Sequence, residues 1–119
     1  MKIREFARDA TKEGLTDEQL KKAIEEMQGG LVGDALGGNL YKKRIAENNR
    51  GKSGGYRTII LFRESANDVF CLFMFAKNTR TNISREELQA LKKLAKEYET
   101  LSEKQIEHAI KNAAFFEVR

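Results

Sequence analysis

Two apolar runs near the middle of the chain decide its fold: YRTIILF at residues 56–62 and VFCLFMF at residues 69–75. Both runs are rich in β-branched and aromatic side chains, which favour strands. The polar segment that joins them, residues 64–68, contains the pair Asn67-Asp68, which is typical of turns. We therefore predict a β-hairpin of two largely buried strands.

A third strand is predicted at residues 40–46, before the hairpin, and the pattern also admits a shorter strand at residues 31–35. A loop at residues 47–55 joins the third strand to the hairpin, and its Gly54-Gly55 lets the chain turn into the next strand.

Helices are predicted on both sides of these strands. Apolar residues at helical spacing indicate a first helix that ends at Gly14. Three more helices are expected to begin at capping boxes, in which a Ser or Thr and a Glu or Gln three residues later exchange hydrogen bonds. The three boxes are Thr16 with Gln19, Ser84 with Glu87, and Ser102 with Gln105. The resulting order, two helices, three or four antiparallel strands and then helices, predicts an α+β fold.

Length and composition narrow the class of protein. The 119 residues fit a single domain, 1–119, which we divide into a core at 1–98 and a C-terminal helical extension at 99–119. The sequence has no apolar run long enough for a transmembrane helix and no signal peptide, so we expect a cytoplasmic protein. With one cysteine and one histidine, it also lacks the usual zinc frameworks, and we expect no metal and no cofactor. Cys71 is expected to be an inert core thiol and His108 a surface residue.

Positive charge is concentrated in the centre of the chain. Residues 39–85 hold ten Lys and Arg against three acidic residues, a net charge of +7, whereas the whole chain carries +4. This asymmetry favours a face that binds a polyanion. The alternative is a solvated surface without a ligand.

The strand pattern gathers these charges into one patch. Lys42 and Arg44 share one face of their strand, and Arg57 faces away from Tyr56, because side chains alternate along a strand. Lys77 and Arg80 follow the end of the second apolar run. Arg44 and Arg57 would instead be structural if they paired with carboxylates, but the nearby acids are too few to neutralise the patch; they are Glu47, Glu64 and Asp68.

Gly51-Lys52-Ser53 resembles the end of a P-loop, but the motif is incomplete. Ala46 stands where its first glycine is required, and a strand rather than a helix is predicted to follow. The phosphate would then lack the helix N-terminus that binds it in a P-loop, so nucleotide binding is not expected.

Three motifs resemble the RelE/HigB toxins of bacterial type II toxin–antitoxin systems: KKRIA at residues 42–46, GKSGGYRT at 51–58 and FAKN at 75–78. The resemblance covers essentially the whole chain in the same order. It implies a RelE-like fold, with two N-terminal helices packed on a twisted, mainly antiparallel sheet. It also implies a metal-independent endoribonuclease that cuts mRNA on the ribosome and so inhibits translation. The implied partners are mRNA, the ribosome and an antitoxin with a helix-turn-helix, and the toxin would contact operator DNA only in complex with that antitoxin.

The resemblance also assigns site residues. Lys42 and Arg44 match the paired basic strand residues of RelE, Arg57 matches its phosphate-binding arginine, and Lys77 and Arg80 match its basic pair after the strand. We expect these five and Lys52 to be catalytic, and we expect four further residues to contact RNA: Lys43, Arg50, Tyr56 and Asn78.

RNA cleavage through the 2′-OH needs a base, positive charge at the phosphate and an acid for the leaving 5′-oxygen. Arginine suits the phosphate because its planar fork binds two oxygens. Lysine acts as a base in its neutral form, which neighbouring cations favour, so Lys42 or Lys52 is the candidate base. Lys77 or Arg80 is the candidate for stabilising the leaving group, and the sequence allows these two roles to be exchanged.

Two positions depart from the RelE pattern, since Asn78 replaces an arginine and Ser84 a catalytic tyrosine. They leave the identity of the base open. They also leave open the alternative of a non-catalytic protein with this fold that only binds RNA or an antitoxin.

Overall fold

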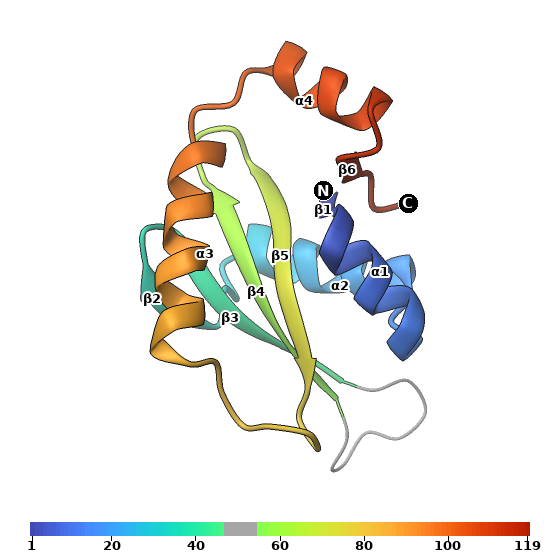
Figure 1. Ribbon diagram of the computed structural model, residues 1–119, viewed down its shortest axis with the longest axis vertical. Helices are drawn as coiled ribbons and strands as arrows, with labels where there is room; N and C mark the ends of the chain where they lie inside the picture. Colours follow the sequence, from blue (N-terminus) through green and yellow to red (C-terminus); the bar gives the residue numbers. More distant parts are fainter. Residues whose placement is uncertain (47–54) are drawn as a thin grey trace.

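The computed structural model describes residues 1–46 and 55–119 of the chain. It contains one mixed sheet of six strands in the order β2-β3-β4-β5-β1-β6, with four helices packed around it (Figure 1). The α+β class predicted from the sequence is therefore confirmed. Residues 47–54 lie outside the described part, and with them most of the predicted loop at 47–55, including Gly54, and the residues of the incomplete P-loop motif.

The predicted hairpin forms the centre of the sheet. β4 (Tyr56–Arg63) and β5 (Asp68–Ala76) are antiparallel, and their register is irregular between Ile59 and Ile60. The third predicted strand is β3 (Leu40–Ile45), which pairs antiparallel with β4. Most side chains of β4 and β5 are buried, because helices cover both faces of the hairpin.

The helices begin where the capping boxes predict. α2 (Asp17–Gln28), α3 (Arg85–Tyr98) and α4 (Glu103–Lys111) each carry both hydrogen bonds of a capping box at the N-terminus. α1 (Arg4–Glu13) ends at Gly14, whose φ of 79° is left-handed and favours glycine. All four predicted helices are thus confirmed.

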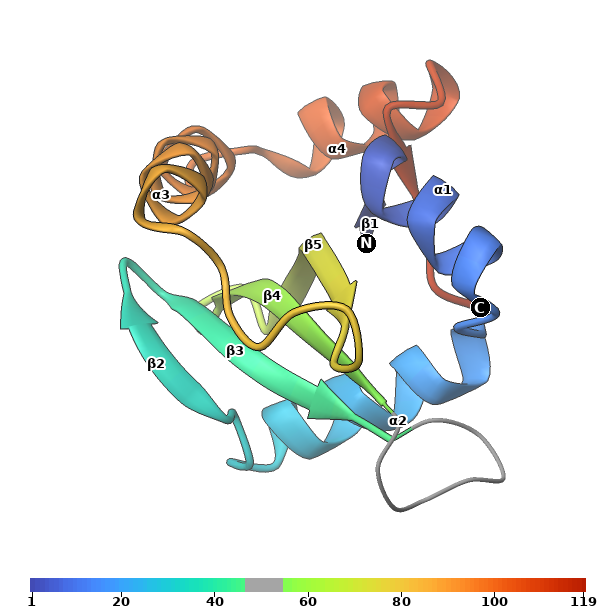
Figure 2. The same cartoon turned by 60° about the horizontal axis from the view of Figure 1, so that its bottom comes forward.

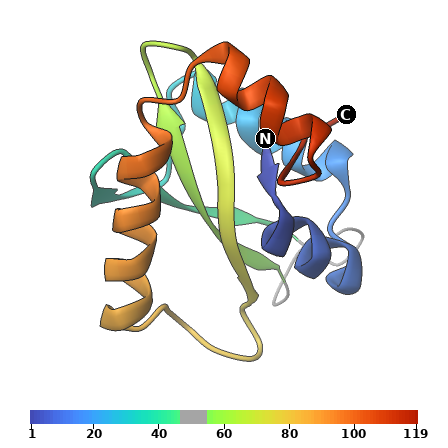
Figure 3. The same ribbon diagram turned by 45° about the horizontal axis from the view of Figure 1, so that its top comes forward.

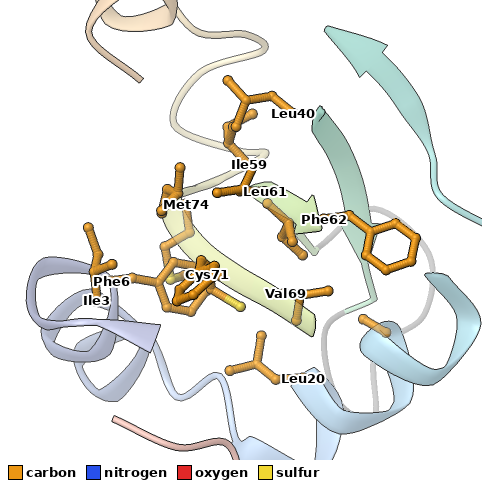
Figure 4. Packing of buried hydrophobic residues seen from close by; sticks show 14 of the residues in the cluster. Ile3, Phe6, Leu20, Leu40, Ile59, Leu61, Phe62, Val69, Cys71 and Met74 are labelled. Atoms are coloured by element: carbon orange, nitrogen blue, oxygen red, sulfur yellow. The ribbon is translucent and has the colours of Figure 1, made fainter. Parts of the chain in front are cut away.

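The sheet separates two layers of helices. α1 and α2 pack on one face, where the Tyr56 hydroxyl donates to the carbonyl of Glu13 and the Lys43 ammonium pairs with Glu26. α3 lies over the opposite face (Figure 2). Figure 4 shows Phe6 and Leu20 of the first layer directed toward the strand that carries Val69 and Cys71. The main apolar core therefore fills the space between the N-terminal helices and the hairpin.

The sheet is larger than the three or four strands expected. β1 (Lys2–Ile3) pairs parallel with β5, and β6 (Phe115–Phe116) pairs antiparallel with β1. The fourth strand, β2 (Asp34–Gly37), begins three residues later than the predicted segment at 31–35. Strands of two to four residues are too short to show a two-residue period, and tertiary pairing alone defines them.

The C-terminal segment folds back to the N-terminus of the chain (Figure 3). Phe115 packs its ring 5.4 Å from that of Phe70 and 5.2 Å from that of Tyr98. Arg63 holds the end of α3, since its guanidinium donates to the Leu101 carbonyl at 2.8 Å and to Asp68. In the part of the chain that is described, none of the helices combines the length and apolarity needed to cross a bilayer.

Candidate functional site

The predicted basic patch forms on the face of the sheet opposite α1 and α2. Arg44 of β3 and Arg57 of β4 are register partners, and Lys42 lies one pleat along β3 on the same face. Side chains of directly opposed residues in an antiparallel pair lie on the same face, so the three cations are neighbours. The strands thus bring together Lys42, Arg44 and Arg57 as the sequence predicts.

These three cations have no acidic partner among the residues that the structure describes. Across residues 1–46 and 55–119, no carboxylate lies within 4.0 Å of their charged nitrogens. One terminal nitrogen of Arg57, Nη1, is buried and has no hydrogen-bond partner among the described residues. A buried donor without a partner costs free energy of folding, so Arg57 Nη1 is available to donate a hydrogen bond to a ligand. The structural alternative, a pairing of Arg57 with Glu64, does not occur, and Glu47 lies outside the described residues.

A cavity of about 550 Å³ lies against this patch. Residues of three neighbouring strands, the turn before β2 and the segment after β5 line it; they are Gly33, Asp34, Lys42, Lys43, Arg44, Arg57 and Thr81. The cavity therefore offers several cations at one concave surface, a combination that suits the phosphates of a nucleic acid backbone.

The segment from residue 77 to residue 84 crosses the sheet (Figure 2), and its Thr81 lines this cavity. Arg80 fixes it: its guanidinium lies 5.1 Å from the ring centre of Phe75 and 5.7 Å from that of Phe73, and it pairs with Glu87. The hydrogen bond from Arg80, together with that from the Ser84 amide, lowers the pKa of Glu87 to about 2. Since Phe75 is the register partner of Arg57, Arg80 lies next to the basic patch, but its charge is already paired.

Two residues that were predicted to contact RNA face away from the basic patch. Lys43 points to the opposite face, where its ammonium donates to the Leu31 carbonyl and pairs with Glu26, both at 2.9 Å. Tyr56 is also buried on that face, and its hydroxyl donates to the Glu13 carbonyl at 2.7 Å. Both residues hold the N-terminal helices on the sheet, because alternation along the strands turns them away from the patch.

Four predicted site residues remain: Lys77, Asn78, Arg50 and Lys52. Lys77 and Asn78 are exposed after β5, and the Lys77 amide donates to the Gly55 carbonyl, two residues before Arg57. Arg50 and Lys52 lie in the segment outside the described residues. Of the expected site, the structure thus joins three cations in one cavity and places Lys77, Asn78 and Arg80 near them.

Sequence reasoning missed Asp34 and Thr81, which also line the cavity. Asp34 is the register partner of Lys42, and the short-strand pattern at 31–35 was its one signal. Thr81 carries no motif.

The cysteine and the histidine take no part in the site. Complete burial raises the pKa of the Cys71 thiol to about 11, so the inert core thiol is confirmed. His108 is exposed on α4, 2.9 Å from the amide of Asn112. Within the described ranges, no group of three or more His, Cys, Asp or Glu side chains is arranged to hold a metal ion.

A family model described as the RelE toxin of the RelE / RelB toxin-antitoxin system matches residues 1–118. None of the curated proteins compared with the chain is similar enough to count as a match.

Proposed function

The chain belongs to the RelE toxin family, and from this premise we propose that it is the toxin of a type II module that cleaves mRNA on the ribosome without a metal ion. Toxins of this family act with an antitoxin and are generally mRNA-cleaving. The proposal goes further by assigning the reaction, its dependence on the ribosome and the residues that carry it out.

One observation carries the proposal. Three cations line a cavity with no described carboxylate within 4.0 Å of their charged nitrogens, and Arg57 Nη1 is buried without a hydrogen-bond partner among the described residues. By contrast, two basic side chains that stabilise the fold have acidic partners: Lys43 pairs with Glu26, and Arg63 pairs with Asp68. A phosphate group in the cavity would supply the missing acceptors.

The reaction uses the nucleophile that RNA itself contains. The 2′-oxygen attacks the adjacent phosphorus, the bond to the 5′-oxygen breaks, and a 2′,3′-cyclic phosphate and a free 5′-hydroxyl remain. Arg57 would hold two oxygens of the phosphate as negative charge develops on it, with Arg44 beside it. Lys42, which also lines the cavity, is the proposed base, with Lys52 as the alternative.

The leaving 5′-oxygen needs a proton or a positive charge. We assign this role to Lys77, since its backbone is hydrogen-bonded to Gly55 near Arg57 and no carboxylate among the described residues lies within 4.0 Å of its ammonium group. Arg80 is better suited to positioning, because Glu87 and two phenyl rings hold its guanidinium.

The proposed partners follow from the family. An antitoxin with a helix-turn-helix would neutralise the protein, the pair would bind operator DNA, and the toxin alone would act on ribosomes in the cytoplasm.

Purified protein and ribosomes programmed with a defined mRNA test the proposal. Primer extension should show cuts within the codon of the empty A site, and the 3′ fragment should begin with a 5′-hydroxyl. The same mRNA without ribosomes tests the ribosome dependence. Binding of the programmed ribosome without cleavage would instead support the non-catalytic alternative.

A further inference from the structure

A carboxylate lines the cationic cavity. Asp34 of β2 is the one acidic side chain among the described residues that line it. It lies opposite Lys42 in the sheet, and yet no charged nitrogen of the described residues approaches its carboxylate within 4.0 Å. An acid at this place opposes the binding of phosphate, so its presence requires another explanation.

The position of Asp34 is fixed by its neighbour. Gly33 has a φ of 84°, and a Cβ at this residue would lie 2.4 Å from the carbonyl oxygen of Lys42. Glycine alone allows so close an approach of two backbones. The residue that follows Gly33 is therefore held against β3, although its side chain is exposed.

Asp34 lies away from the phosphate position. The sheet places Asp34, Lys42 and Ile59 in one row and Arg44, Arg57 and Phe75 in the next. Two strand spacings separate β2 from β4, roughly 10 Å across the sheet. A nucleotide whose phosphate is held by Arg57 can extend its base over this distance toward Asp34, while Lys42 lies between the two.

A carboxylate is an acceptor with two oxygens, and it selects partners with two adjacent donors. Guanine is the RNA base that presents such a pair, N1–H and the N2 amino group, on its Watson–Crick edge. We propose that Asp34 is a specificity-determining residue that binds the Watson–Crick edge of a guanine in the substrate, a proposal that rests on the proposed function of the same cavity.

A purely electrostatic role would give a different result. If Asp34 only weakened the binding of anions, its loss would strengthen the binding of all RNAs by the same factor. A role in reading the base changes the ratio between substrates, so the ratio is the quantity to measure.

The test compares RNA oligonucleotides that carry guanosine or inosine at one position. Inosine lacks the N2 amino group and retains N1–H. The oligonucleotides are 2′-O-methylated, so that binding is measured without cleavage. We expect the wild-type protein to bind the guanosine RNA about 10-fold more tightly, the usual effect of one hydrogen bond to a charged group. D34N should lose this preference, because its amide would face N1–H with a donor.

E64Q is the matched control, since Glu64 is an exposed acid on the β4–β5 turn and does not line the cavity. It removes the same charge and should keep the preference. An equal affinity of the wild type for both RNAs, an unchanged preference in D34N, or no binding of either RNA would overturn the proposal. Cleavage of the unmodified RNA on ribosomes is assayed separately, so a failure of the proposed function is seen there and not in the binding ratio.

Discussion

Lys42 and Lys43 are neighbours in the chain, but their ammonium groups have opposite surroundings. Lys42 lines the cavity and has no acidic partner among the described residues, whereas Lys43 is buried against α2 with Glu26 and the Leu31 carbonyl. The alternation of side chains along the strand thus separates a charge that lines the cavity from a charge that pairs with α2, within two residues. This pair therefore offers a matched test of the site.

We predict that Lys43→Ala lowers the free energy of unfolding by about 1–2 kcal/mol, because a hydrogen bond and an ion pair are lost. Lys42→Ala should leave it unchanged and should reduce mRNA cleavage. Urea denaturation and ribosome-dependent cleavage are measured on the same two preparations. The opposite result, a stable and inactive Lys43→Ala, would contradict the orientation of β3.

At the scale of elements, the face formed by β3 and β4 acts as a single basic surface. Binding of single-stranded RNA should weaken with salt, and each phosphate that is neutralised adds about 0.7 to the slope of log K against log salt concentration. We predict that alanine at Lys42, Arg44 or Arg57 reduces this slope by about 0.7. Fluorescence anisotropy at several salt concentrations measures it, and a slope that no variant changes would show that RNA binds elsewhere.

The segment between β5 and α3 depends on the pair Arg80 and Glu87. A hydrogen bond from Arg80 and a second one from Ser84 lower the pKa of Glu87 to about 2 from an ordinary value of 4.5, so the carboxylate form stabilises the folded state. This contribution is fully present above about pH 4.5 and is lost as the pH falls through 4.5 toward 2.

We therefore predict that the stability difference between the wild type and Glu87→Gln is constant near neutral pH and shrinks on acidification. Thermal melts of both proteins from pH 7 to pH 2.5 measure this difference. A difference that grows on acidification would contradict the pairing of Arg80 with Glu87.

The elements that the sequence predicts are those with a strong local signal. Capping boxes marked α2, α3 and α4, and two long apolar runs marked the hairpin. β1 and β6 have two residues each and exist because the chain ends meet, which no local pattern encodes. Asp34 lies beside Lys42 because of the register of β2, a four-residue strand whose pairing with β3 is irregular. The sequence therefore predicted the cations of the cavity but not Asp34.

At the scale of the whole molecule, the family and the open cavity imply a protein that is harmful when free. We predict that induced expression in a bacterial host stops growth and that co-expression of the antitoxin restores it. The host should tolerate Arg57→Ala expressed at the same level, because this variant lacks the side chain that we propose binds the phosphate of RNA. Growth curves with immunoblots to match expression test this, and normal growth with abundant wild-type protein would count against a toxin.

The Arg57 side chain has no hydrogen-bond or ion-pair partner among the described residues, and we propose that it binds the phosphate of RNA. Tyr56, its neighbour on the other face, provides the control: Tyr56→Ala should cost about 3 kcal/mol of stability through the loss of a buried ring. Arg57→Lys should be scarcely more active than Arg57→Ala, because the ammonium group of lysine is a point charge and cannot bind two phosphate oxygens at once.

The most direct measurement is the rate of ribosome-dependent mRNA cleavage per folded molecule for Arg57→Ala, with the melting temperature taken on the same preparation. We predict a loss of about 100- to 1000-fold in rate, the usual effect of removing one transition-state donor, at an unchanged melting temperature. A lowered melting temperature with an unchanged rate would contradict the account, since Arg57 would then be a structural residue of β4.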